Sequence, residues 1–406
     1  MNKESIGIIF EPLYLKNITL KNRLIRAATY EGCADSNGFP QKELLNVYEA
    51  LAQGGIGTLI TGFVFISQNG RAMQPKQCGI DNDDKINAWS SIIQPLKKRY
   101  PETAIFMQLA HTGRQTRTEI TRQPVLGVSQ KKCSYFKQKV NLLTDIQITD
   151  IIEQFALAAK RAKIIGFDGV QIHAAHGYLI HQFLSSWTNI RKDRWKEKNL
   201  FLTEIIHAIR SLCGNNFPIL VKLSAEDDNK NGIQPEDTIE TAQQLKTMNV
   251  DAIEISYGTM EYAFNIIRGK RPIDTALTVN PLFNRINPIL LAIFRKLFLA
   301  KHLKPLKPFS ENYNLASATQ IKANVPDLPI ITIGGVRSLS SILSILSTKQ
   351  ADAISLSRPL IIEPNMPNKI RDGSWTKSAC VNCNLCTIYC DTMQSTHCHL
   401  KRYNNE

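Results

Sequence analysis

Two histidines and a tyrosine follow one short apolar run of the chain. His173 and His176 are three residues apart, and Tyr178 comes two residues later. Two imidazoles at this spacing can converge on one substrate oxygen, and a phenol beside them can supply a proton. With His181 nearby, the pair also resembles part of a zinc site, although the motif offers no acidic general base at the usual spacing. His181 has a further alternative, a hydrogen-bonded histidine of the core.

A pair of glycines and a later arginine form a second candidate site. Gly334 and Gly335 directly follow the apolar run at 330–333, and Ser357 and Arg358 follow the run at 353–356. Glycine has no Cβ, so a backbone N–H can approach a ligand closely, and arginine supplies a charge-assisted pair of hydrogen bonds. A glycine pair alone is typical of an ordinary turn, but together with the arginine it can hold one phosphate. The pattern therefore predicts a phosphate-bearing cofactor.

Two polar residues interrupt apolar runs. Gln108 lies in the run at 104–109, and Lys222 lies in the run at 219–223. A buried charge must be paired or functional, so the two side chains could hydrogen-bond a planar heterocycle. A lysine near a reducible ring would also stabilise the anion that forms on reduction. The alternative is a lysine whose head group reaches solvent at the end of a strand.

The elements that must position these residues are short β-branched or apolar runs separated by helical patterns. The clearest helical pattern is 150–165, where Asp150 and Glu153 form a cap-like start. Strands that alternate with helices predict a parallel sheet, and eight of them predict an α/β fold closed into a (β/α)8 TIM barrel, with the chemistry at the carboxyl ends of the strands. The eight expected strands are Leu24–Thr29, Thr58–Thr61, Ala104–Leu109, Gly169–His173, Ile219–Leu223, Ala252–Ser256, Ile330–Ile333 and Ala353–Leu356.

Composition excludes several classes of protein. The chain has 406 residues, of which 43% are hydrophobic, and this excludes a disordered or collagen-like chain. The first fifteen residues include Lys3 and Glu4 and do not resemble a secretory signal, so we expect a cytoplasmic protein. The uncharged window 50–70 holds five glycines, which favours a buried strand with loops over a membrane span.

The formal net charge of +14 raises nucleic acid or an anionic membrane as partners. Between Ile267 and Pro308, however, nine Lys or Arg residues stand against one Asp, so much of the excess belongs to one segment. Its centre, 288–299, has apolar residues at three- and four-residue steps beside basic ones, which predicts an amphipathic helix. We expect the apolar face to pack on the barrel or cover the substrate pocket. The alternative is a peripheral membrane or nucleic-acid-binding protein, with weak membrane contact through 285–304.

Five cysteines crowd into the last part of the chain, from Cys380 to Cys398. Without a secretion signal, such a cluster favours metal or redox chemistry over disulfides. Cys383, Cys386 and Cys390 have a spacing typical of an iron–sulfur cluster, and Cys398 could be a fourth ligand. The expected metal ligands are therefore these four thiols, which would hold an iron–sulfur cluster or zinc. Reduced, metal-free thiols are the alternative.

Several motifs in the same order resemble the Old Yellow Enzyme family of NADH:flavin oxidoreductases. The resemblance runs from about Phe10 to about Pro367. The Cys-rich end is loosely similar to the iron–sulfur region of the larger dienoyl-CoA reductase-like members. The residues that carry the resemblance are Asn22-Arg23, Gln108-Leu109-Ala110-His111-Thr112-Gly113-Arg114, His176-Gly177-Tyr178-Leu179, Gln182-Phe183-Leu184-Ser185, Gly334-Gly335 and Ser357-Arg358-Pro359.

The resemblance implies a barrel that holds non-covalent FMN and an enzyme that uses NAD(P)H to reduce an activated alkene in a ping-pong reaction. It implies that His173 and His176 bind the carbonyl or nitro oxygen of a small-molecule substrate and that Tyr178 donates the proton. The cofactor-binding roles fall on Ala27, Ala28 and Thr29 against one flavin face, Gly62 through its backbone, Gln108 at the pyrimidine edge, Lys222 beside N1, and Gly334, Gly335, Ser357 and Arg358 around the phosphate.

The resemblance also divides the chain. Residues 1–367 form the FMN-binding barrel, with a long insertion at about 260–310 between the sixth and seventh strands, and residues 368–406 form the Cys-rich tail. Members of the family have Arg where Lys222 stands, and a lysine cannot make the same two-pronged contact. We expect no nucleic-acid partner. The oligomeric state is not indicated by the sequence.

Overall fold

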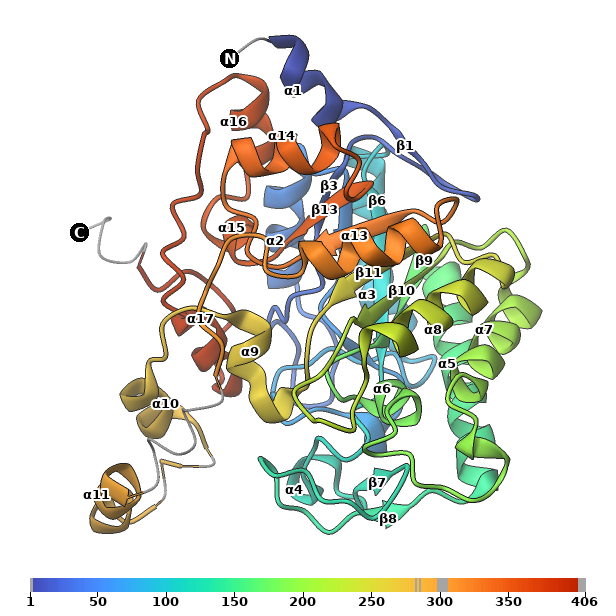
Figure 1. The fold of residues 1–406 in the computed structure, drawn as a ribbon, viewed down its shortest axis with the longest axis vertical. Coiled ribbons are helices and arrows are strands. Elements are labelled where there is room, and N and C mark those ends of the chain that lie inside the picture. The colour runs from blue at the N-terminus through green and yellow to red at the C-terminus, as the bar shows by residue number, and fades with distance from the viewer. Residues whose placement is uncertain (1–2, 282, 285, 298–305, 401–406) are drawn as a thin grey trace.

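A computed structural model describes residues 3–281, 283–284, 286–297 and 306–400, and its centre is a closed barrel of eight parallel strands (Figure 1). The first barrel strand pairs with the last, and the second pairs with the third, so the ring closes. Each predicted run overlaps one of these strands, and the (β/α)8 barrel is confirmed. The strands are β3 (Leu24–Arg26), β4 (Thr58–Ile60), β6 (Ala104–Ala110), β9 (Gly169–Ala174), β10 (Ile219–Ser224), β11 (Ala252–Ser256), β12 (Ile330–Ile333) and β13 (Ala353–Leu356).

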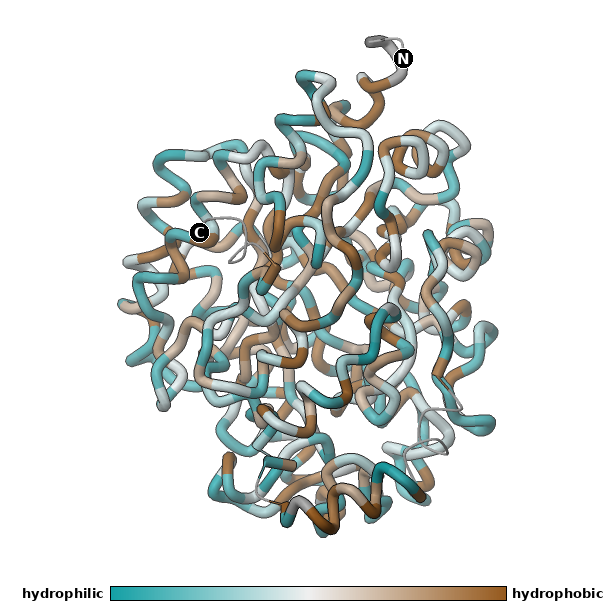
Figure 2. The backbone as a smooth tube through the Cα atoms, turned by 90° about the vertical axis from the view of Figure 1, so that its left-hand side faces the viewer, coloured by the Kyte–Doolittle hydropathy of each residue, from teal (hydrophilic) through white to brown (hydrophobic). Residues whose placement is uncertain are grey.

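Helices between the strands surround the barrel, and their apolar faces pack on its outer surface. In α7, for example, Phe201, Ile205 and Ile209 are fully buried and follow one another at four-residue steps. The tube in Figure 2 shows the apolar segments mainly inside the molecule. The surrounding helices are α2 (Glu43–Gln53), α3 (Lys85–Arg99), α5 (Asp145–Ile165), α7 (Leu200–Cys213), α8 (Pro235–Thr247), α13 (Leu315–Asn324) and α14 (Leu339–Ser347).

Helix α5 begins earlier than the sequence pattern predicted. The expected start at Asp150 lies within the helix, which begins at Asp145. Thr144 caps it, because its side chain accepts a hydrogen bond from the backbone of Gln147 while the Gln147 side chain accepts one from Thr144. This reciprocal capping box satisfies two backbone donors that the first turn would otherwise leave free. The predicted end at Ile165 is confirmed.

The barrel interior has an apolar floor. Inward-facing side chains of the strands meet there, together with leucines of a hairpin formed by β1 (Leu13–Tyr14) and β2 (Thr19–Leu20). The hairpin lies at the amino ends of the strands, because the backbone N–H of Asn17 donates to Asp251 at the start of β11. Polar side chains of the interior must therefore gather toward the carboxyl ends. The floor consists of Leu13, Leu15, Leu20, Ile25, Ile60, Ala104, Phe106, Leu220, Ala252, Ile331 and Ala353.

The connection between β11 and β12 contains the predicted insertion. It includes η3 (Met260–Tyr262), α9 (Ala263–Ile267), α10 (Ile273–Val279) and α11 (Pro288–Leu297). The predicted amphipathic helix is confirmed in α11, but residues 298–305 of the basic segment lie outside the described residues. The expectation that its apolar face packs on the barrel is wrong, since Ile289, Leu290 and Leu297 are 71%, 60% and 63% exposed. Figure 1 shows α11 beyond α10, away from the barrel.

The Cys-rich tail packs against the insertion rather than forming a separate body. Its α17 (Leu385–Ile388) and η4 (Tyr389–Asp391) contact α10, and the backbone of Thr396 donates to the carbonyl of Glu31. None of the described helices combines the length and apolar content that crossing a membrane requires. The remaining short elements are α1 (Lys3–Phe10), β5 (Val64–Phe65), η1 (Gln68–Gly70), α4 (Thr118–Thr121), β7 (Leu126–Gly127), β8 (Asn141–Leu142), α6 (Leu179–Leu184), η2 (Arg194–Lys196), α15 (Arg358–Ile362) and α16 (Met366–Arg371).

Candidate active site

A cleft of about 160 Å³, open to solvent, lies at the carboxyl ends of the strands. Its wall comes from the ends of β10 to β13, from the residues that follow them, and from the connection before α13. Because parallel strands end at one rim, residues far apart in the sequence meet here. The predicted site residues that line the cleft are Ala28, His176, Lys222, Gly334, Gly335, Ser357 and Arg358.

The glycine pair after β12 forms a turn that leaves no room for side chains. Both residues have positive φ angles, 125° for Gly334 and 80° for Gly335. A Cβ on Gly334 would lie 2.6 Å from the side-chain nitrogen of Asn314, and one on Gly335 would lie 2.7 Å from the carbonyl oxygen of Ser310. Only glycine fits both the backbone conformation and the space. The turn is therefore specific, not an ordinary one.

Arg337 is a cleft residue that the sequence analysis missed. It is 4% exposed, and its Nε and Nη1 atoms have no hydrogen-bond partner among the described residues. Arg358 lies beside it, with Nη1 donating to the carbonyl of Arg268 and to Asn384. Two neighbouring buried guanidiniums with unused donors suit a phosphate. The signal was present in the sequence, because Arg337 follows the glycine pair by two residues.

His173, His176 and Tyr178 come together at the end of β9. The ring centroid of His173 lies 5.0 Å from the ring centroid of His176 and 4.8 Å from that of Tyr178. His176 has a φ of 61° and its Nε2 lies 2.8 Å from the hydroxyl of Ser256. Burial holds the pKa of both imidazoles well below its usual range, and the charge of Lys222 adds to the effect. The histidines are therefore neutral hydrogen-bond donors at neutral pH.

The phenol of Tyr178 is 5% exposed, and its ring also contacts Phe63 at a centroid distance of 5.8 Å. Burial raises its pKa above the usual value, and Asp391 of the tail adds to the effect. The hydroxyl therefore keeps its proton at neutral pH, as a proton donor must. His181, in contrast, faces Asp227, with 3.3 Å between Nε2 and Oδ2. No group of metal-ligating side chains suited to one ion exists among the described residues, and this does not support a zinc hydrolase.

The predicted flavin-binding residues that follow β3 and β4 make hydrogen bonds within the protein. Ala27 is fully buried, and the hydroxyl of Thr29 donates to its carbonyl or to Ser357, at 2.9 Å each. The backbone N–H of Gly62, which the resemblance assigned to the flavin, donates instead to Glu31 at 2.8 Å. A Cβ on Gly62 would lie 2.3 Å from the same carboxylate. Gly62 is thus needed to accommodate Glu31.

Gln108 and Lys222 belong to a polar layer above the apolar floor. Gln108 donates to Gln171, Gln171 donates to Glu254, and Lys222 forms an ion pair with Glu254 at 3.5 Å. All four side chains are at most 3% exposed. Lys222 is therefore a paired, buried charge, and the alternative of a head group that reaches solvent is wrong. Gln171 and Glu254 also interrupt apolar strands, so the pattern that identified Lys222 could have found them.

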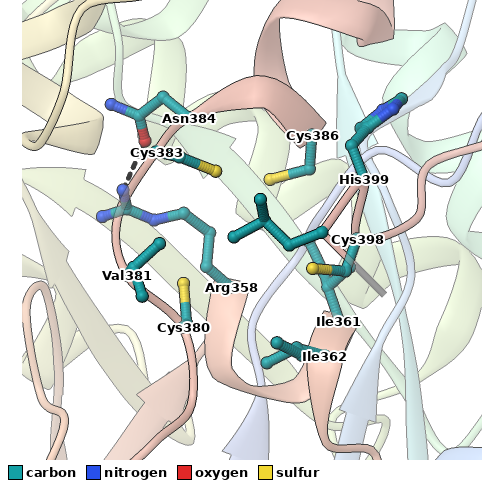
Figure 3. A pocket seen from close by; sticks show the side chains of 11 residues that line it. Arg358, Ile361, Ile362, Cys380, Val381, Cys383, Asn384, Cys386, Cys398 and His399 are labelled. Atoms are coloured by element: carbon teal, nitrogen blue, oxygen red, sulfur yellow. Dashed lines mark hydrogen bonds between the residues drawn. The ribbon is translucent and has the colours of Figure 1, made fainter. Parts of the chain in front are cut away.

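A second, small cavity, of about 20 Å³, lies between the tail and α15 (Figure 3). Four thiols line it, those of Cys380, Cys383, Cys386 and Cys398. Cys390, predicted as a ligand, lies outside this lining, and its Sγ is 3.2 Å from the carbonyl of Cys386. Cys380, which was not among the predicted ligands, lies in the lining instead. Burial raises the pKa of Cys386 to about 11, and Arg358 opposes this effect.

The sequence matches the model of the NADH:flavin oxidoreductase / NADH oxidase family over residues 8–274. An NADH oxidase of Thermoanaerobacter brockii is 27% identical over 93% of this chain and 53% of its own length. An NADPH dehydrogenase of Clostridium acetobutylicum is 29% identical over 88% of this chain and 92% of its own length. The chain thus spans about half of the first relative and most of the second.

Solved structures share the fold at lower identity. A 2-naphthoyl-CoA reductase complex has a TM-score of 0.79 at 21% identity, with 97% of this chain and 56% of that chain covered. Morphinone reductase has a TM-score of 0.69 at 20% identity, with 91% of each chain covered. At this level of identity, the likeness concerns the barrel architecture.

Proposed function

Because the chain belongs to the Old Yellow Enzyme family of NADH:flavin oxidoreductases, we propose that this oxidoreductase uses NAD(P)H to reduce an activated alkene such as an enone. The observation that carries the proposal is the group of three buried rings at the end of β9, two neutral imidazoles and a protonated phenol, beside the cleft. Hydrogen-bond donors for a carbonyl oxygen and a proton for a carbon atom are the two groups that this reduction needs.

The cleft fits FMN as the bound cofactor. Arg337 offers guanidinium nitrogens that have no partner among the described residues, and Gly334, Gly335 and Arg358 line the same cleft. These groups would hold the phosphate, while Gln108 and Lys222 would face the ring system. When bound, FMN supplies a ring that can accept and return a hydride.

The protein's own side chains handle the oxygen and the proton. His173 and His176 donate hydrogen bonds to the carbonyl oxygen of the substrate and so polarise the alkene. One alkene carbon gains a hydride that originates from NAD(P)H, and the other gains the proton of the Tyr178 hydroxyl. The Tyr178 phenolate then recovers a proton from water. NAD(P)H and the alkene occupy the site in turn, which is a ping-pong order.

A spectrum and a titration test this proposal. We expect the purified protein to be yellow, to release FMN on denaturation, and to be reoxidised by an enone after anaerobic reduction with NADH or NADPH. Release of FAD, or no flavin binding after reconstitution, would contradict the cofactor assignment. Reduced protein that reacts with oxygen but not with any enone would contradict the substrate class.

For the tail, we propose an iron–sulfur cluster held by Cys380, Cys383, Cys386 and Cys398. Four thiols around one cavity, with Arg358 in its wall, are the ligand type and the positive surroundings that such a cluster requires. Zinc fits less well, because no three of the described candidate ligands are placed to hold one ion, whereas a cluster spreads its ligands over several irons. Equal amounts of iron and acid-labile sulfide in anaerobically purified protein would support the cluster.

A second candidate role, weak contact with an anionic membrane, is favoured by the exposure of α11. Ile289, Leu290 and Leu297 present an apolar surface, and Lys296 adds positive charge beside it. Self-association through this helix would bring two strongly basic insertions together, whereas an anionic surface would neutralise them. We therefore propose that the described part of the segment 285–304 touches lipid head groups.

A further inference from the structure

A chain of side-chain hydrogen bonds crosses the buried interior of the barrel. It joins Gln108 on β6, Gln171 on β9 and Glu254 on β11, with Lys222 on β10 as the ionic partner of Glu254. The two hydrogen bonds between amide and acceptor are both 2.7 Å long. Glu254 and Gln171 are fully buried, and Gln108 is 1% exposed. Bulk water therefore does not compete for the hydrogen bonds of these three side chains.

The carboxylate of Glu254 determines which group donates and which accepts in each of these hydrogen bonds. An ionised carboxylate only accepts hydrogen bonds, so Gln171 must turn its NH2 group toward Glu254. The carbonyl oxygen of Gln171 then points to Gln108, which must donate its own NH2 group. The remaining carbonyl oxygen, Oε1 of Gln108, takes part in no hydrogen bond within the described part of the chain. A charge at one end thus determines which atom is presented at the other.

If Glu254 only formed an ion pair with Lys222, the orientation of the two glutamine amides would not be specified. The Nζ of Lys222 lies 3.5 Å from Oε1 of Glu254, whereas Nε2 of Gln171 lies 2.7 Å from Oε2 of the same residue. The carboxylate of Glu254 is therefore closer to the amide nitrogen of Gln171 than to the ammonium group of Lys222. Such a series of buried polar groups favours one orientation when its inner members are paired, and both Gln171 and Glu254 are paired with their neighbours.

We propose that Glu254 is a positioning residue that holds Gln108 as a hydrogen-bond acceptor for the flavin. The inference rests on the proposed function, in which Gln108 meets the pyrimidine edge. That edge of oxidised flavin has one N–H, at N3, between two carbonyl groups. An acceptor in front of N3 fits it, whereas an NH2 group in the same place would leave N3–H unpaired. Glu254 acts on the ring through two glutamines and does not touch it.

The test is NMR of 15N-labelled FMN bound to the protein, with the exchange rate of the N3 proton as the readout. In Glu254→Gln the new amide can donate as well as accept, so both directions of the chain become available. We expect the N3 proton to exchange with water at least tenfold faster in this variant than in the wild type. An unchanged exchange rate would overturn the proposal.

Asp251→Asn is the matched control. Asp251 lies on the strand start three residues before Glu254, is 1% exposed, and accepts from the backbone of Ile219 at 2.8 Å. Its loss should lower thermal stability while the N3 exchange rate stays within twofold of the wild type. Equal acceleration in both variants would mean that any buried carboxylate matters, which would also overturn the proposal.

A second variant guards against a failure of Glu254→Gln to fold. Gln171→Met removes the middle of the chain while Glu254 keeps its contact with Lys222. The same tenfold acceleration is expected, and wild-type exchange in this variant would overturn the proposal. If wild-type protein binds no FMN at all, the proposed function itself is contradicted and this inference falls with it. Bound FMN with wild-type exchange in the variants contradicts the positioning role alone.

Discussion

The flavin cleft and the thiol-lined cavity share one wall, Arg358, yet they are built in opposite ways. The cleft takes its residues from strand ends whose register fixes their positions, as in the pairing of Lys222 with Glu254 and of Leu223 with Ala174. The cavity takes its thiols from the irregular segment 380–398. A rigid sheet therefore positions one site, while the other depends on what holds a loop in place.

Asparagines hold that loop. Asn384, which is 1% exposed, accepts from Arg358 and donates to the carbonyl of Lys270 at 2.9 Å. Asn382 accepts from Arg337. The two arginines that suit a phosphate in the cleft thus also anchor the tail. The tail thus depends on two cleft residues, and Thr387 of the tail in turn lines the cleft.

The largest expected effect tests the chemistry of the cleft alone. Tyr178→Phe removes the proposed proton donor, so the rate of enone reduction should fall by roughly 100-fold or more. Reduction of the bound flavin by NAD(P)H should stay within twofold, because no proton from Tyr178 is needed there. Stopped-flow kinetics of the two half-reactions measure both. Enone reduction at the wild-type rate would show that another group donates the proton.

The second-largest expected effect concerns Arg358, which lines both the cleft and the thiol-lined cavity. Arg358→Ala removes a charged hydrogen bond to the phosphate, worth roughly 1.5–3 kcal/mol, so the Kd for FMN should rise roughly 10- to 150-fold. Because Arg358 also holds Asn384, iron content should fall in the same variant. Flavin fluorescence and iron assays report the two losses. Loss of iron with unchanged flavin affinity would mean that Arg358 serves the tail only.

Two cysteine variants sharpen the description of the cavity. Cys380→Ser removes a thiol that lines it, and we expect iron content to fall about tenfold. Cys390→Ser is the matched control, since its thiol bonds to the carbonyl of Cys386 instead. It should keep wild-type iron content. The opposite result would restore the ligand set that the spacing of the cysteines suggested. FMN binding should be unchanged in both variants.

The free energy of unfolding should depend on pH through Asp391, a carboxyl group of the tail. Burial raises the pKa of Asp391 from 3.8 to about 6, while hydrogen bonding from Gln74 opposes the shift. The folded protein therefore binds a proton between pH 4 and 6 that the unfolded chain has lost. The free energy of unfolding should fall by up to about 3 kcal/mol as pH rises through this range.

Calorimetry of Asp391→Asn measures that contribution. The fall in Tm between pH 4 and 6 that Asp391 causes in the wild type should be absent from the variant, so the difference curve between the two proteins should show it. Asp372→Asn is the control, because this exposed tail carboxyl has a lowered pKa held by Ser374. It should leave the fall in place. Identical pH profiles of the wild type and Asp391→Asn would contradict the assignment.

The smallest effect concerns α11, whose described residues line neither the cleft nor the thiol-lined cavity. Changing Leu290 and Ile293 to Glu places charge on the exposed face of α11, and binding to anionic vesicles should weaken on the order of fivefold. Enone kinetics should be unchanged. Ile146→Glu, at an exposed position on α5, is the control. Altered substrate affinity without altered vesicle binding would restore the expectation that this helix covers the pocket.

The sequence by itself determined the barrel and the place of three of its rings. Short β-branched or apolar runs placed all eight strands, and the spacing of His173, His176 and Tyr178 identified the three rings that meet. This works because apolar runs and local motifs depend on neighbours in the chain, and closure of the barrel then follows. Gly334, Gly335 and Arg358 were found for the same reason, since each directly follows a strand.

Only the tertiary structure decided which groups outside those motifs come together. The spacing of the cysteines could not show that Cys380 rather than Cys390 faces the cavity, because a loop can turn either thiol toward it. Nor could the sequence show that the N–H of Gly62 donates to Glu31, which lies 31 residues away in the chain. The chain from Glu254 to Gln108 crosses the barrel between strands, and contacts of that kind exist only after the sheet closes.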